Sequence, residues 1–138
     1  MDLKFPFEVT FINLSDQDKT ASYWFLVRYH NGTELDVLEQ TKCWGVFDRV
    51  DQQIKKKYGV DEDNRDVGVE YGAYWPAPIW GYLFPVHGIP WSEFRPEWLI
   101  EILSDLNNVH PVMGVVIGES KDAVLGYLAD LSLNESGD

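Results

Sequence analysis

Residues 22–38 read SYWFLVRYHNGTELDVL, and this stretch carries the strongest local signal for the fold. Asn31 and Gly32 are typical of a type I′ turn, which needs two positive φ angles, and β-prone residues lie on both sides. The pattern therefore predicts a hairpin, with one face in the core: Trp24, Leu26, Leu35 and Val37. The other face is either covered by another element or forms an aromatic and acidic surface: Tyr23, Phe25, Val27, Tyr29, Glu34 and Asp36.

Hydrophobic periodicity predicts the remaining elements. The expected strands are 4–13, 67–71, 79–84 and 111–118. The expected helices are 41–58, a segment that starts at Ser92 or Arg95, and 120–131. The second helix has Pro96 in its first turn and an apolar face of Trp98, Leu99, Ile102, Leu103 and Leu106. The third begins at Ser120 as N-cap, with Val124, Leu125, Leu128 and Leu131 facing inward, although Gly126 leaves a strand possible there.

These elements predict an α+β fold: a mainly antiparallel sheet of about five to six strands with two to three helices on one face. The expected order is β-ββ-α-ββ-α-β-α. A chain of 138 residues fits a single domain, 1–138, of which 132–138 are expected to form a flexible tail. One cysteine, Cys43, excludes an internal disulfide, and no signal peptide or membrane-spanning segment is recognisable, so the expected compartment is the cytoplasm.

The net charge is −12, and it is unevenly distributed along the chain. Residues 1–58 hold nine acids and eight bases, whereas residues 59–138 hold fourteen acids and three bases. Phosphate backbones and anionic membranes would repel such a chain, so we expect neither direct nucleic-acid binding nor membrane binding. A basic protein is the natural complement.

No motif identifies a catalytic residue, a cofactor or a metal site. Residues 118–122, GESKD, lack the second glycine of a nucleophile elbow, which favours Ser120 as a helix cap. The three histidines are far apart, and DEDNRD at 61–66 fails the calcium-loop pattern because Arg65 stands at a ligand position. We therefore expect a binding protein rather than an enzyme.

Acidic residues recur every four positions at Glu93, Glu97, Glu101 and Asp105. On a helix the last three stack on one face, where like charges repel each other. A helix selected only for stability would place lysines among them. This acidic stripe, together with Asp61, Glu62, Asp63, Asp66 and Glu70, is therefore either a solvated face or a docking surface for a basic protein.

The stretch 71–91 concentrates seven aromatic residues and four of the seven prolines. Prolines pre-order a loop, and tyrosine or tryptophan on a stiff loop often anchors an interface. Tyr74 and Trp75 lie at the turn and are expected to be exposed, although the aromatics can also simply seal the sheet.

Two functional hypotheses follow. The first is an acidic intracellular protein that neutralises a basic partner by occlusion, such as a bacterial immunity protein or inhibitor acting on a nuclease toxin. The second is a small-molecule or carbohydrate-binding domain, with or without hydrolysis, in which Trp75, Trp80 and Trp91 stack a sugar while Glu70 and Glu93 supply carboxylates. The oligomeric state is not predicted.

Overall fold

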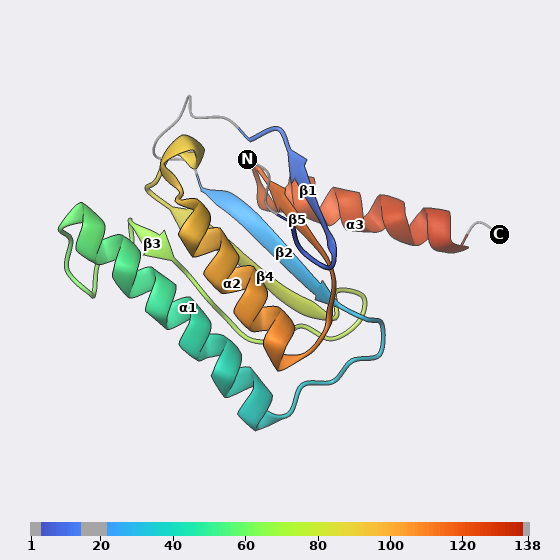
Figure 1. Cartoon of the computed structure of the whole chain (residues 1–138). Coiled ribbons are helices and arrows are strands. Elements are labelled where there is room, and N and C mark those ends of the chain that lie inside the picture. The colour runs from blue at the N-terminus through green and yellow to red at the C-terminus, as the bar shows by residue number, and fades with distance from the viewer. Residues whose placement is uncertain (1–3, 15–21, 137–138) are drawn as a thin grey trace.

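The computed structural model describes residues 4–14 and 22–136, which form a mixed five-stranded sheet between helices (Figure 1). In chain order the elements are β1 (Glu8–Ile12), β2 (Tyr23–Tyr29), α1 (Val37–Tyr58), β3 (Gly68–Val69), β4 (Gly81–His87), the 3₁₀ helix η1 (Trp91–Glu93), α2 (Pro96–Val109), β5 (Val112–Gly118) and α3 (Lys121–Ser136). The expected α+β class and mostly antiparallel sheet are confirmed. The order differs from the expected one by a single strand, the second arm of the predicted hairpin.

The sheet has the order β1-β5-β2-β4-β3, which makes β2 its central strand. β2 pairs antiparallel with β5 and β4, with Phe25 opposite Ile117 on one side and Phe84 on the other. Only β1 and β5 run parallel. A central strand covered on both faces has no solvent side, which explains why β2 is apolar almost throughout instead of alternating with polar residues.

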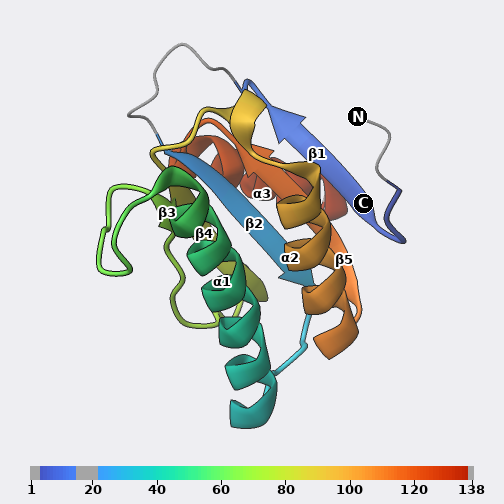
Figure 2. The same ribbon diagram turned by 60° about the vertical axis from the view of Figure 1, so that its left-hand side comes forward.

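The main core lies between the sheet and the two helices α1 and α2, which run side by side across one face (Figure 2). β2 contributes its aromatic face, Tyr23, Phe25, Val27 and Tyr29. Of the two alternatives for the predicted face, cover by another element is therefore the one observed for these four residues, whereas Glu34 and Asp36 are exposed. α2 buries all five residues of its predicted apolar face, and its N-cap is Arg95, one of the two expected starts, with Pro96 in the first turn as predicted.

Helix α3 packs on the opposite face of the sheet (Figure 2), so the expectation that all helices share one face is wrong. Its Val124 and Leu128 contact a second, smaller core with Leu26 and Val116. The physical reason is that β2 carries apolar side chains on both faces of the sheet, so α3 must shield the second face from water. Ser120 caps α3 as predicted, by accepting a hydrogen bond from the Ala123 amide at 3.1 Å.

The predicted tail is partly helical, because α3 continues to Ser136. Residues 132–136 thus extend the helix, and residues 137 and 138 lie outside the described part of the chain.

The predicted hairpin at 22–38 is wrong, because the chain enters α1 at Val37 instead of forming a second strand. Asp36 and Glu39 form a capping box: the Glu39 amide donates to Asp36 Oδ1 at 2.8 Å, and the Asp36 amide donates to Glu39 Oε1 at 3.1 Å. This cap starts the helix four residues before the expected position. The Asn31-Gly32 turn only redirects the chain from the sheet to the helix layer.

Candidate partner-binding surface

A polar groove of about 500 Å³ lies between α1 and the segment that follows it. Its walls carry five carboxylates, from Asp48, Asp51, Glu62, Asp63 and Glu70. The basic side chains in the lining are Lys55 and Arg65, with His87 at the β4 end. Carboxylates therefore outnumber lysine and arginine side chains in this groove. A concave surface with an excess of carboxylates is suited to binding cationic groups.

Hydrogen bonds of Asp51 and Lys55 connect α1 to the segment that forms the other wall of this groove. Lys55 Nζ donates to Asp51 Oδ2 at 2.9 Å and to the Glu62 carbonyl at 3.0 Å, while Asp51 Oδ1 accepts from the Val69 amide at 2.9 Å. Gly68 passes close to this point with φ 129°, where a β-carbon would overlap Asp51. Asp51 is thus committed to structure, and the carboxylates that remain for a ligand are at the rim.

The groove brings together three residues of the predicted acidic loop and strand. Glu62, Asp63 and Glu70 line it, whereas Asp61 and Asp66 are exposed in the same loop outside the lining. This part of the predicted site is one continuous acidic region.

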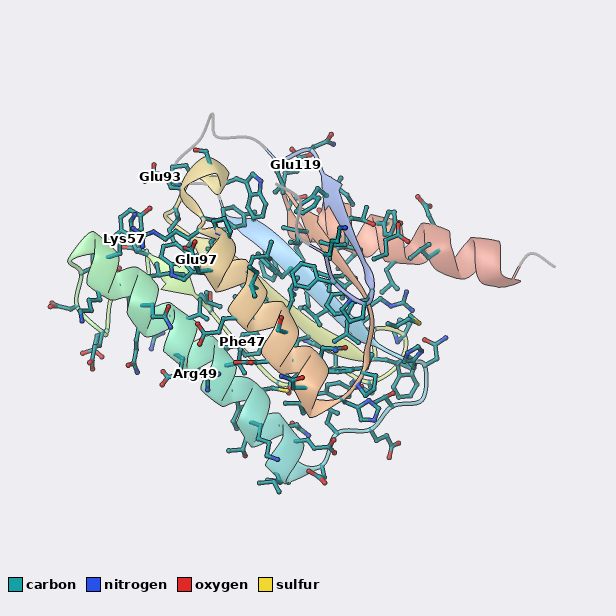
Figure 3. The ribbon with its side chains drawn as sticks, viewed as in Figure 1. Phe47, Arg49, Lys57, Glu93, Glu97 and Glu119 are labelled. Atoms are coloured by element: carbon teal, nitrogen blue, oxygen red, sulfur yellow. The ribbon has the colours of Figure 1, made fainter. Side chains whose placement is uncertain are left out.

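The acidic stripe, with Glu93 on η1 and its other three residues on α2, lies elsewhere, beside α1; Figure 3 labels Glu93, Glu97 and Arg49. Arg49 of α1 reaches across to α2, with Nε 3.2 Å from Glu101 Oε1 and Nη2 2.6 Å from Asp105 Oδ2. The expectation that a stable helix would need interleaved lysines is therefore wrong, because the compensating cation comes from the neighbouring helix. Half of the stripe is already paired within the chain.

The first two residues of the stripe, Glu93 and Glu97, have different environments. Glu93 accepts a hydrogen bond from the Tyr58 hydroxyl at 2.9 Å, and burial followed by this bond raises the pKa of Tyr58 to about 12. Glu97 is exposed to solvent. Of the four stripe residues, Glu97 is the one most available to a partner.

The two aromatic residues predicted at the turn have different environments. Tyr74 is half-buried: its hydroxyl donates to the Thr33 carbonyl at 2.6 Å, and its ring packs near Tyr29 and Tyr82. The expectation that Tyr74 is exposed is wrong, since this ring closes one end of the core. Trp75 is 49% exposed and pairs its backbone with Gly81.

The tryptophans of the carbohydrate hypothesis lie at opposite ends of the sheet. Trp91 packs edge-on against Tyr23 at the start of β2, whereas Trp75 pairs with Gly81, which lies opposite Arg28 at its end. Trp91 lines an apolar hollow of about 550 Å³ in which none of the described lining residues is a carboxylate, and no tryptophan is among the described residues of the polar groove. Neither hollow brings one of these tryptophans together with described carboxylates.

Three hydrogen-bonded side chains at one end of strands β2, β4 and β3 were not predicted from the sequence. Ser22 Oγ lies 2.5 Å from His87 Nδ1, and His87 Nε2 lies 2.7 Å from Glu70 Oε2. The order hydroxyl, imidazole, carboxylate is that of a serine nucleophile and its base. Ser22, however, does not line the groove that Glu70 and His87 border, and the two contacts join the residue before β2 to the end of β4 and to the residue after β3.

Cys43 is a buried residue of α1 that faces the core, and burial raises the pKa of its thiol. Tyr29 and Tyr82 next to it are also buried, and their pKa values are raised by the same cause. A thiol held in its protonated form inside the core is unreactive. Cys43 therefore contributes packing.

Within residues 4–14 and 22–136, no group of three or more histidine, cysteine, aspartate or glutamate side chains could hold a metal ion. The helices of this same part of the chain include none long and apolar enough to cross a membrane. No family model, curated protein or solved structure matches the chain.

Proposed function

We propose that this protein binds a basic protein partner in the cytoplasm and neutralises it by occlusion, as a toxin-immunity protein or inhibitor does. The observation that carries the proposal is the groove beside α1, in which five carboxylates face two lysine or arginine side chains. The net charge of −12 supports it, because long-range attraction would guide a basic partner to this surface.

In this mechanism, lysine or arginine side chains of the partner enter the groove and meet Asp48, Glu62, Asp63 and Glu70. Charge-assisted hydrogen bonds to carboxylates are shorter and stronger than neutral ones. A nuclease toxin fits this role, since it needs a basic cleft to hold phosphate groups. The acidic groove would cover that cleft and exclude the nucleic acid.

A salt-dependent pull-down with matched charge reversals tests the proposal. The purified protein is used to capture proteins from the cell that produces it, at low and at high salt. The test variant is Glu62→Lys with Asp63→Lys, in the groove. The control is Glu119→Lys with Asp130→Lys, which changes the net charge equally at two exposed positions outside the groove lining (Figure 3 labels Glu119).

We expect the wild type and the control to retain a basic protein at low salt, and the groove variant to lose it. Adding the wild type should also inhibit nucleic-acid cleavage by the captured protein. The proposal is wrong if no basic protein is retained, or if both variants lose it equally, because equal loss would indicate non-specific attraction to net charge.

A further inference from the structure

Exposed apolar side chains meet along the side of α1 that faces the segment after β3. The described residues include seven large exposed hydrophobic residues, and three of them lie on this side: Val37, Trp44 and Tyr71. We call these three residues the apolar band. The other four point elsewhere: Leu38 lies on the side of α1 that faces α2, Trp75 on the face of the sheet opposite α1 and α2, Phe11 on β1 and Ile100 on α2.

Hydrogen bonds and ring contacts hold the loop part of the band against the helix. Trp44 Nε1 donates to the Gly72 carbonyl at 2.9 Å, and the Tyr71 ring stacks on Phe47 at 5.9 Å between centroids. Val37 and Trp44 are seven residues apart on α1, so they share one face of the helix. The band therefore has a fixed geometry before any partner arrives.

The fold does not require apolar residues at the start of α1. The capping box is made by Asp36 and Glu39, and neither bond involves the two residues between them. Val37 is 80% exposed and Leu38 is 64% exposed, so both keep most of their side-chain area in water. Polar residues would serve a solvated first turn equally well, and contiguous exposed apolar surface commonly marks a binding site.

The apolar band joins the acidic groove directly. Tyr71 belongs to the band and also lines the groove, and Asp48 lies one helical turn after Trp44. The exposed carboxylates of Glu34 and Asp36 flank the other end of the band. An apolar centre bordered by carboxylates is complementary to a surface that carries apolar side chains among lysines or arginines.

We propose that the apolar band anchors the basic partner, and that the partner presents apolar side chains interleaved with basic ones. This inference rests on the proposed function and adds the chemistry of recognition: the groove supplies charge, and the band supplies the buried anchor. The charge favours such a partner over a second copy of this chain, because two copies at −12 each would bring like charges together.

Two synthetic peptides of equal charge serve as probes of the band. One alternates lysine with leucine and the other alternates lysine with serine, and binding of each is followed by fluorescence anisotropy. The band variants are Val37→Ser and Trp44→Ser. The matched control is Ile100→Ser, because Ile100 is a similarly exposed apolar residue on α2.

We expect the wild type and Ile100→Ser to bind the lysine-leucine peptide more tightly than the lysine-serine peptide. Each band variant should weaken binding of the lysine-leucine peptide about tenfold, as truncation of an interface anchor does. Binding of the lysine-serine peptide should change little. Circular dichroism of each variant checks that the fold is intact.

The two proposals fail in distinguishable ways. If the wild type does not prefer the lysine-leucine peptide, or if Ile100→Ser weakens binding as much as the band variants do, the band is not the anchor. In that case the groove proposal still stands, provided that Glu62→Lys with Asp63→Lys abolishes binding of both peptides. If this groove variant leaves binding of both peptides unchanged, the groove proposal fails as well.

Discussion

Gly81 is the residue at which the sheet tolerates the least added volume. A β-carbon there would lie 1.9 Å from the Val27 carbonyl oxygen and 3.0 Å from the Arg28 α-carbon, both of which are backbone atoms. We expect Gly81→Ala to lower the free energy of unfolding by about 2 kcal/mol or more, because β2 and β4 must separate. Urea denaturation followed by circular dichroism measures this loss.

Gly126 provides the opposite case within the same chain. It lies in α3, and a β-carbon there would meet nothing within 4 Å. Gly126→Ala should therefore raise the free energy of unfolding by about 0.5–1 kcal/mol, since alanine has less backbone entropy to lose in a helix. If Gly81→Ala and Gly126→Ala changed the free energy of unfolding in the same direction and by a similar amount, both explanations would be wrong.

Tyr58 reports on the environment at the start of the acidic stripe. Burial and then the bond to Glu93 raise its pKa from 10.0 to about 12. The folded state therefore favours the protonated phenol of Tyr58. The stability that this preference contributes is present below pH 10 and is lost as the pH rises toward 12. In Glu93→Gln the pKa should fall while staying above 10, because burial is the larger cause.

Ultraviolet absorbance of the phenolate, compared with that of Tyr58→Phe to isolate this residue, measures the pKa. An unchanged pKa in Glu93→Gln would show that the carboxylate has no influence on Tyr58.

Among the contacts between elements, the side chain of Arg49 links α1 to α2. This side chain is 52% exposed, and exposed ion pairs contribute little, so we expect Arg49→Met to lower the free energy of unfolding by about 1 kcal/mol. Part of this loss comes from Glu101 and Asp105, which are then left as uncompensated like charges at i,i+4. The difference from wild type should shrink at high salt.

Lys56→Met is the control for Arg49→Met, because Lys56 is exposed on the same helix and forms no ion pair with the described residues. Denaturation at low and high salt compares the two variants. An equal loss in both, or a loss that salt leaves unchanged, would mean that the seam between the helices does not depend on this pair.

The elements differ in how far the sequence predicts them. α2 was predicted with all five inward residues, because its apolar period and Pro96 are local signals that agree with each other. The hairpin failed because the segment after Asn31-Gly32 carries two signals at once. Val37 and Leu38 suit a strand, whereas Asp36 and Glu39 form a capping box, and the cap prevailed.

The candidate site depends more on tertiary packing than the elements do. The acidic loop was predicted, but its groove exists only because Lys55 and Asp51 hold that loop against α1. From the sequence, the acids of the stripe were expected to lack a cationic partner. Their partner Arg49 could not be identified, because it is about fifty positions away in the sequence. The contacts that join Ser22, His87 and Glu70 likewise depend on strand register, which no local pattern contains.

Across the domain, the two faces of the sheet are covered unequally. The main core joins α1 and α2 to the sheet, whereas the second core has four buried residues among the side chains that the structure describes: Leu26, Val116, Val124 and Leu128. Local opening is easiest where little apolar area is buried. We therefore expect α3 to detach from the sheet more readily than α1 or α2, while the main core stays closed.

Amide hydrogen exchange and thiol alkylation measure the two cores separately. Amides of α3 should exchange faster than those of α2, and Cys43, a fully buried residue of α1, should react with iodoacetamide only when the whole domain unfolds. Leu128→Ala, a truncation that costs about 2–3 kcal/mol at buried sites, should speed exchange in α3 and leave Cys43 protected in native buffer. If exchange in α2 and alkylation of Cys43 accelerate as much as exchange in α3, the three layers unfold as one unit and the smaller core is not separable.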